Sequence, residues 1–185
     1  MKIIFVSDIH GSLSRLEKVA EFIKSENPDN IVMLGDALYH GPRNPLPEEY
    51  NPSAVALLLN QFKDKITAVR GNCDSEVDQM LIDYPMMADY SQLFIDGKKW
   101  FATHGHLYQP ESSFPSQESF DVFISGHTHL PVLHEQDGKI IFNPGSISLP
   151  KGGNEPTFGM YENLTFKLMS LEGEPLEQLE IINQK

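Results

Sequence analysis

Apolar residues recur along the chain in two different patterns, one typical of strands and one typical of helices. Five short apolar runs, rich in β-branched and aromatic residues, have the length of buried strands. They lie at residues 2–7, 30–35, 65–71, 98–105 and 120–127. Between the first two runs, apolar residues from Leu13 to Ile23 recur at helical spacing, with Ser12 or Ser14 as N-cap candidates. A second helix is predicted from Pro52 to Phe62, because proline suits the first turn of a helix.

This alternation of strands and helices predicts an α/β fold. After residue 130 the pattern changes, and strand-like pieces separated by Gly, Pro and Asn fill residues 132–149 and 157–171. We predict that these pieces form a second sheet packed on the first. The proline-rich segment "HGPRNPLPEEYNP", residues 40–52, predicts a long ordered loop. With 185 residues, the chain has the size of one domain, and we predict a single domain over residues 1–185.

The composition narrows the choice of partners and compartment. Lys and Arg number 14 against 26 Asp and Glu, so the formal net charge is −12. Such a charge repels polyanions and argues against long nucleic acids as partners. One cysteine excludes an internal disulfide, and no apolar stretch approaches the roughly 18 residues of a membrane span. We therefore expect a cytoplasmic protein. A small anionic substrate is still possible if the charge is locally reversed, and the protein could form a homo-oligomer.

The strand ends carry the candidate chemistry. The five predicted strands end in "SDIHG", "GDALYHG", "GNCD", "THGH" and "GHTH". Ligands of α/β sheets bind at the carboxyl ends of strands, so these Asp, Asn and His side chains are expected to converge on one crevice. A two-residue spacing, as in Asp8 and His10 or His127 and His129, places both side chains on one side of an extended chain. Each pair is then ready to chelate one ion.

The candidate metal ligands are Asp8, His10, Asp36, Asn72, His104, His127 and His129. Seven ligands are too many for one tetrahedral zinc ion. They suit two ions with five or six ligands each that share a carboxylate, and water fills the remaining positions. Two ions about 3.5 to 4 Å apart can clamp the attacking and leaving oxygens of a phosphoryl displacement.

In this order, the five strand-end motifs resemble those of the calcineurin-like metallophosphoesterases. The family pattern is D-x-H, G-D, G-N-[HC]-[DE], H and G-H-x-H. "HGPRN", "RGNCDSEVDQML", "FNPGS" and "PKGG" more narrowly resemble a group of bacterial phosphodiesterases in that family. The resemblance spans the chain and implies a four-layer αββα sandwich of two mixed sheets flanked by helices. It also implies that Asp8, His10 and His129 hold one ion, that Asn72, His104 and His127 hold the other, and that Asp36 bridges them.

The resemblance implies a metal-dependent phosphodiesterase for small phosphodiesters, with a hydroxide activated by two ions as the nucleophile. Two carboxylates and two divalent ions leave the site at about +2, which attracts a phosphate anion into an acidic protein. Manganese is the expected metal, because shells of His, Asp and Asn without thiolate accept Mn, Fe, Co, Ni or Zn. A phosphomonoesterase of the same fold is one alternative. The other is a protein-binding scaffold like a retromer coat subunit, which has lost metal-site histidines that are all present here.

Asn72, Cys73 and His106 are the catalytic candidates. Most family members have a histidine where this chain has Cys73, and a histidine can protonate the leaving oxygen. Three interpretations of Cys73 stay open: a passive residue lining the site, a weak acid or substrate contact, and a metal ligand or redox switch. His106 follows His104 by two residues and either faces the same crevice or lies outside it.

Further polar residues lie close to these motifs. His40 and Arg43 follow the strand that ends at Asp36, and a guanidinium there can hold a phosphate oxygen by a forked contact. Asp74 is expected to cap a helix in "SEVDQML", and His134 is expected to be structural. His40 and Arg43 are therefore the substrate-binding candidates.

Overall fold

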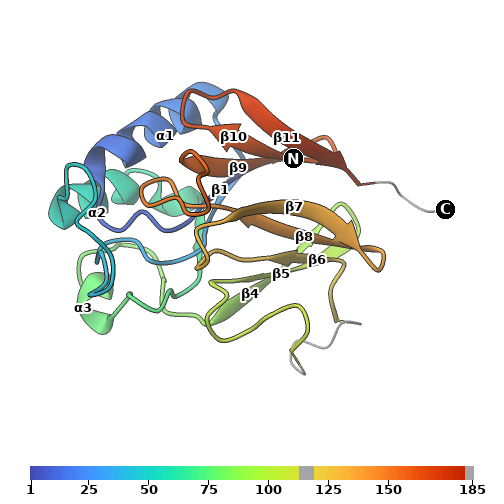
Figure 1. Ribbon diagram of the computed structural model, residues 1–185, viewed down its shortest axis with the longest axis horizontal. Helices are drawn as coiled ribbons and strands as arrows, with labels where there is room; N and C mark the ends of the chain where they lie inside the picture. The colour runs from blue at the N-terminus through green and yellow to red at the C-terminus, as the bar shows by residue number, and fades with distance from the viewer. Residues whose placement is uncertain (113–118, 182–185) are drawn as a thin grey trace.

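Two mixed β-sheets pack face to face in the computed structural model, which describes residues 1–112 and 119–181 (Figure 1). The first sheet has the strand order β11-β10-β9-β1-β2-β3 and the second has the order β4-β5-β6-β8-β7. The first sheet consists of β1 (Lys2–Val6), β2 (Asn30–Met33), β3 (Ile66–Ala68), β9 (Thr157–Glu162), β10 (Thr165–Ser170) and β11 (Pro175–Glu180). The second consists of β4 (Tyr90–Ile95), β5 (Lys98–Thr103), β6 (Val122–Ile124), β7 (Pro131–Gln136) and β8 (Lys139–Pro144).

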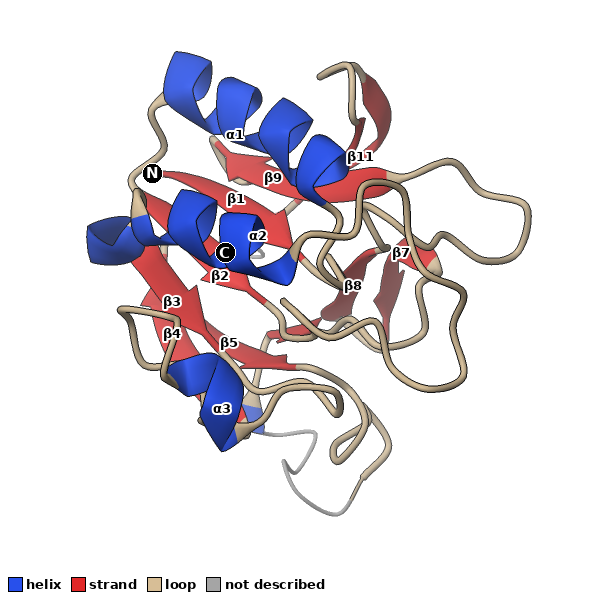
Figure 2. Ribbon diagram, turned by 90° about the vertical axis from the view of Figure 1, so that its left-hand side faces the viewer, coloured by secondary structure: helices blue, strands red, loops and turns tan. Residues whose placement is uncertain are grey.

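The helices α1 (Leu13–Glu26) and α2 (Pro52–Asn60) cover the outer face of the first sheet (Figure 2). They connect the parallel strands β1, β2 and β3, and a short 3-10 helix (Lys63–Lys65) precedes β3. Ser12 is the N-cap residue of α1, but its hydroxyl donates to the carbonyl of Glu48. Asn51 caps α2 by accepting a hydrogen bond from the backbone N–H of Ala54, and Pro52 occupies the first turn. Both predicted helices are confirmed, although α2 ends before Phe62.

Strand β1 is buried on both faces, which explains its unbroken apolar run. Ile4 and Val6 pack with α1 and α2, whereas Ile3 and Phe5 point between the sheets. There the Phe5 ring lies 6.2 Å from Trp100 and 5.2 Å from Phe142, centre to centre. Aromatic packing of this kind joins the two sheets into one sandwich.

The outer face of the second sheet is covered differently. Phe101 and Phe123 on this face pack with Phe120 and Tyr108, which lie outside the strands. In residues 1–112 and 119–181, loops therefore provide the cover that α1 and α2 give the first sheet. The α/β sandwich of two mixed sheets is confirmed. None of the described helices is long and apolar enough to cross a membrane.

The division of strands between the sheets differs from the prediction. The fourth and fifth predicted strands, β5 and β6, belong to the second sheet, and the strands after residue 130 are split between the two. Of these, β7 and β8 extend the second sheet, whereas β9 pairs antiparallel with β1 in the first. Local patterns indicate where a strand begins and ends, but contacts between distant residues determine which strand it pairs with. β4 was not predicted, because its residues are mostly exposed or half-buried on an edge.

A further correction concerns the short helix α3 (Glu76–Gln79). The helix is present, but Ser75 and not Asp74 is its N-cap. Ser75 and Asp78 form a reciprocal capping box, in which Asp78 Oδ2 accepts hydrogen bonds from the backbone N–H and hydroxyl of Ser75. Asp74 is therefore free to bind other backbone groups. The loop predicted over residues 40–52 is confirmed up to Asn51, since Pro52 begins α2.

Candidate metal centre

The seven predicted ligands all follow the carboxyl end of a strand. Asp8 and His10 follow β1, Asp36 follows β2, Asn72 follows β3, His104 follows β5, and His127 and His129 follow β6. The first three of these strands belong to one sheet and the other two to its partner. The predicted convergence therefore takes place between two sheets, at one end of the sandwich.

Five of the seven have a left-handed backbone conformation, which is uncommon for residues other than glycine. Their φ angles are 53° for Asp8, 49° for His10, 54° for Asp36, 66° for His127 and 59° for His129. The expectation that each two-residue pair lies on extended chain was wrong. This backbone costs about 1 to 2 kcal/mol per residue. Hydrogen bonds between the loops offset part of that cost, among them Asp8 N to Gly35 O at 3.1 Å and His10 N to Asp36 O at 2.9 Å.

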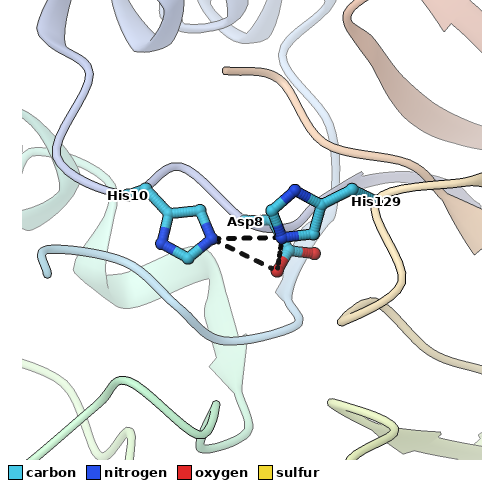
Figure 3. A group of neighbouring side chains, drawn as sticks. All are labelled: Asp8, His10 and His129. Carbon is cyan, nitrogen blue, oxygen red and sulfur yellow. Dashed lines mark hydrogen bonds and ion pairs between the residues drawn. The ribbon is translucent and has the colours of Figure 1, made fainter. Parts of the chain in front are cut away.

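One group of potential ligands, which we call the inner half, contains Asp8, His10 and His129 (Figure 3). Their side chains are buried, with at most 3% of any residue exposed. The Nε2 atoms of His10 and His129 lie 3.2 Å apart. Asp8 Oδ1 lies 3.3 Å from His129 Nε2 and 3.7 Å from His10 Nε2. Three potential ligand atoms thus face one point in the interior.

Hydrogen bonds at the opposite ring nitrogens fix which atom each histidine presents. His10 Nδ1 contacts Tyr39 O at 2.9 Å, His129 Nδ1 contacts Leu149 O at 2.6 Å and His104 Nδ1 contacts Leu34 O at 2.7 Å. A carbonyl oxygen only accepts, so each Nδ1 carries the proton and a neutral ring keeps its lone pair on Nε2. Two lone pairs therefore face each other in the inner half. Asp8 Oδ1, beside them, is buried without a hydrogen-bond partner among the described residues. A bound cation satisfies all three atoms, so the donor set fits a metal ion.

The outer half contains Asn72, His104 and His127. Asn72 Oδ1 lies 3.1 Å from His104 Nε2, and the rings of His104 and His127 are 5.1 Å apart between centres. Asn72 is exposed and His127 is half-buried, in contrast to the inner half. His127 lies beside His104, whereas His129 lies beside His10. The expectation that these two histidines chelate the same ion is therefore not supported by the geometry.

Asp36 lies between the two halves. Its Oδ2 atom is 3.7 Å from His10 Nε2 in the inner half and 3.5 Å from His104 Nε2 in the outer half. Its other oxygen, Oδ1, accepts a hydrogen bond from the backbone N–H of Cys73 at 2.8 Å. One carboxylate oxygen thus faces both halves while the other is held in place.

The carboxylates give this site a field that stabilises positive charge. Burial alone would raise the pKa of Asp8 and of Asp36, but the nearby histidines hold both below their usual range. Burial would lower the pKa of His104, but hydrogen bonding to Asp36 and the charges of Asp8 and Asp36 raise it to about 9. Burial lowers the pKa of His10 and of His127. In the absence of metal, His104 is therefore protonated at neutral pH.

Asp74 holds the backbone next to the site in place through hydrogen bonds, a role that the sequence analysis missed. Its carboxylate accepts hydrogen bonds from the backbone N–H groups of Asp36 at 2.8 Å, Ala37 at 2.9 Å and Gly71 at 2.7 Å. Burial, followed by the charge of Asp36, raises its pKa to about 6. A Cβ atom at Gly71 would overlap Asp36 Oδ1, which explains the glycine of "GNCD". One buried carboxylate thus ties the turn after β2 to the turn after β3.

Serine side chains orient Asp8 in a similar way. Ser7 Oγ donates to Asp8 Oδ2 at 2.6 Å, and the backbone N–H of His127 donates to the same oxygen at 3.0 Å. Ser146 Oγ and Ser148 Oγ donate to the Asp8 carbonyl at 2.8 and 3.0 Å. Ser146, the last residue of the "FNPGS" segment, and Ser148, two residues later, are therefore supporting residues. Their motif was visible in the sequence, but their partner was not.

A cleft of about 450 Å³ opens onto the site. It is lined by Asp36, Gly41, Pro42, Arg43, Asn44, Asn72, Cys73, His127, Thr128, His129 and Lys151. Arg43 and Lys151 are the cationic residues in this lining. Arg43 therefore lies where a phosphate-binding residue was predicted, and Lys151 joins it although no role had been predicted for it.

The other candidates lie close to the site but in different settings. Cys73 Sγ accepts a hydrogen bond from Asn72 Nδ2 at 3.2 Å, and burial raises the pKa of its thiol to about 12. The half-buried His106 ring lies 5.4 Å from the His104 ring, outside the cleft lining. His40 is also outside that lining and packs between Tyr39 and Tyr50. His134 is exposed on β7, as expected of a residue without a role in the site.

Fold and site together define a phosphoesterase with a candidate metal centre. The family model for the calcineurin-like phosphoesterase superfamily domain matches residues 1–165, and the chain belongs to this superfamily. The resemblance that the motifs indicated is thereby confirmed, and the chain is an enzyme of the phosphoesterase class.

Individual relatives refine this placement. The chain is 49% identical to phosphodiesterase YfcE of Escherichia coli K12 over 177 residues, which are 95% of each chain. A solved structure of the E. coli phosphoesterase Yfce superposes with a TM-score of 0.93 at 45% identity, covering 98% of this chain and 100% of that one. Vps29 of Entamoeba histolytica, solved with Zn²⁺, gives a TM-score of 0.67 at 19% identity, covering 98% of this chain and 100% of that one. This last likeness shows a shared fold alone.

Proposed function

We propose that the protein is a metal-dependent phosphodiesterase that hydrolyses small phosphodiesters at a site for two divalent ions. The observation that carries this proposal is the pair of facing Nε2 lone pairs 3.2 Å apart in the inner half, beside the unpartnered Asp8 Oδ1. The name of the E. coli relative, a phosphodiesterase, supports a diester over a monoester substrate. Both sheets supply ligands, so we also propose that residues 1–185 form one domain.

The two halves would divide the ions between them. Asp8, His10 and His129 would hold one ion, Asn72, His104 and His127 would hold the other, and Asp36 would be shared. Manganese is the proposed metal, because these oxygen and imidazole donors include no thiolate. When bound, such ions supply Lewis acidity to phosphoryl oxygens and lower the pKa of a water molecule. They would also give the cleft a net positive charge of about +2 in an acidic protein.

The chain's own residues would orient the substrate. Arg43 can hold a phosphate oxygen through its planar guanidinium, and Lys151 adds a second positive charge to the lining. The His106 ring lies 5.4 Å from the His104 ring, centre to centre, and would act through it. Cys73 keeps its proton at neutral pH, because burial and Asp36 raise its pKa. We therefore assign it as a residue that lines the cleft and contacts substrate, rather than as a metal ligand.

Hydrolysis of bis-p-nitrophenyl phosphate and of p-nitrophenyl phosphate tests this function. Metal-stripped protein is assayed with and without Mn²⁺, alongside Asp36→Asn and a matched exposed control, Asp64→Asn. We expect diester cleavage that requires Mn²⁺, persists in the Asp64 variant and is lost in the Asp36 variant. Faster cleavage of the monoester would instead indicate a phosphomonoesterase. No turnover with any divalent ion, despite bound metal, would favour the protein-binding scaffold.

A further inference from the structure

A second cleft of about 700 Å³ adjoins the first. The two share Pro42, Arg43, Asn72 and Cys73 in their linings. A molecule whose phosphate lies in the first cleft can therefore extend past Cys73 into the second without leaving the protein surface. None of the seven candidate ligands except Asn72 lines the second cleft, so its chemistry is set by other residues.

The walls of the second cleft are largely apolar and aromatic. They include Leu38, Tyr39, Tyr50, Pro52 and Val77. Tyr39 is 41% exposed and Val77 is 66% exposed, so part of this apolar surface faces solvent. The Tyr50 ring packs edge-on against the His40 ring, with the ring centres 5.2 Å apart and the planes at 82°. Exposed rings and aliphatic groups of this kind pack well against a flat ring.

The charges of the second cleft are unsuited to a second anion. Its lining contains the carboxylates Asp74 and Asp78, and Arg43 is its cationic residue. Asp78 is held in place by Ser75, from which it accepts two hydrogen bonds. Arg43 is shared with the first cleft, where a phosphate would take its charge. The second cleft therefore favours an uncharged group over a further phosphate or carboxylate.

We propose that the second cleft binds an uncharged aromatic or heteroaromatic substituent of a phosphodiester whose phosphate lies in the first cleft. The proposal rests on the proposed function and adds the substrate class: diesters with at least one flat ring, from an aryl group or a nucleoside. Diesters with two short alkyl groups would leave the Tyr39 and Val77 surface uncovered. They are therefore poorer ligands.

Binding of two phosphonates measures this preference without turnover. Phenylphosphonate and methylphosphonate are not hydrolysed, and at a pH above the second ionisation of both they carry the same charge, so their ratio of dissociation constants there isolates the contribution of the ring. We expect protein loaded with Mn²⁺ to bind phenylphosphonate about tenfold more tightly, from partial burial of the ring. Isothermal titration calorimetry gives both constants. Adenosine 5′-monophosphate adds a nucleoside arm, and a preference for it over methylphosphonate also supports the proposal.

Two matched substitutions test whether the preference for the ring comes from the second cleft. Val77→Glu puts a charged side chain into the second cleft, whereas Met80→Glu makes the same change three residues later, at a site that is 83% exposed and outside both linings. We expect Val77→Glu to reduce the preference for the ring to less than about threefold, since the ring would meet a hydrated carboxylate. The Met80 variant should retain the full preference. Neither residue belongs to the proposed metal site.

The outcomes separate this proposal from the function itself. Equal binding of both phosphonates, or equal effects of the two substitutions, would overturn the second cleft as a ring-binding site even if Mn²⁺-dependent diester cleavage is found. Phosphonate binding with the expected preference, but no cleavage, would leave the cleft standing and overturn the phosphodiesterase.

Discussion

The inner and outer halves of the candidate metal centre each combine two histidines with an oxygen ligand, a carboxylate in one and an amide in the other, and their surroundings differ. In the inner half, Asp8 and His10 are fully buried and their donor atoms lie within 3.7 Å of each other. In the outer half, Asn72 is exposed and His127 is half-buried on the cleft. Burial leaves a lone carboxylate oxygen with no water to bind, so the inner half gains most from a cation.

The difference suggests a division of labour between the halves. Hydrogen bonds from Ser7 and to the carbonyls of Tyr39 and Leu149 fix the inner half before any ion binds. Such preorganisation favours tight, slowly exchanging metal binding. The outer half has fewer fixed contacts and faces the space where substrate would lie. We therefore expect the inner ion to be retained and the outer one to exchange readily.

Removing one histidine from each half tests this division most strongly. We expect His129→Ala to lower activity by more than about a hundredfold, because it removes a direct ligand from the buried half, where solvent water cannot readily replace it. His127→Ala should lower the affinity for one ion by about tenfold and be partly rescued by excess Mn²⁺. Metal content after dialysis and kcat/KM at rising Mn²⁺ give both values. Equal losses and equal rescue in the two variants would contradict unequal halves.

Asp74 is expected to matter for stability as well as for the site. Asp74→Ala leaves the buried backbone N–H groups of Asp36, Ala37 and Gly71 without their acceptor, which should lower the free energy of unfolding by about 3 kcal/mol. Urea denaturation of the metal-free protein measures this loss. The matched variant Asp78→Ala removes a cap of α3 instead and should lose only about 1 kcal/mol. The same loss of unfolding free energy in both variants would show that the three hydrogen bonds of Asp74 contribute no more than the capping contact of Asp78.

The pH dependence of metal binding should follow His104. Its pKa is raised to about 9 in the folded metal-free protein, above the 6.5 of the unfolded chain. Its stabilising contribution is therefore fully present below pH 6.5 and is lost as the pH rises through 9. An ion at His104 Nε2 must displace this proton, so Mn²⁺ affinity should rise between pH 7 and 9 by at most about tenfold per pH unit. Calorimetry in buffers of different ionisation enthalpy counts the released protons, and no release at pH 7.5 would exclude this competition.

The smallest expected effect concerns Cys73. Its thiol is a weak acid in this setting, because burial raises its pKa to about 12. Cys73→His should raise turnover of alkyl esters by up to about tenfold, since an imidazolium can protonate a poor leaving oxygen. Nitrophenyl esters, whose leaving group needs no proton, should change less. Parallel assays of both ester types test the difference. An equal change in turnover for both would show that Cys73 does not limit protonation of the leaving group.

The sequence predicted which side chains come together better than it predicted the sheets that bring them together. All seven candidate ligands were proposed from five strand endings, because polar residues directly after apolar runs are a local signal. No local signal in the sequence shows that β5 and β6 belong to a second sheet, because sheet membership depends on pairing between distant strands. The left-handed backbone at Asp8 and His10 was equally hidden, because hydrogen bonds to the loop after β2 impose it.

The supporting residues were missed for the same reason. Asp74 binds backbone groups 37 and 38 residues away, and Ser146 binds the carbonyl of Asp8 across 138 residues. Locally, Asp74 has the sequence of a helix cap, and only the folded chain shows that Ser75 takes that role. The second cleft likewise combines side chains from the loop after β2, the start of α2 and the region of α3. No single segment carries its pattern.

The number of Mn²⁺ equivalents that metal-free protein needs for diester hydrolysis tests the two-metal site most directly. Unequal halves predict two binding events in a calorimetric titration, with the first equivalent entering the inner half. Activity should stay low after that equivalent and rise to its maximum as the second one binds. Full activity at one equivalent, with no further binding at higher Mn²⁺, would contradict a site that works with two ions.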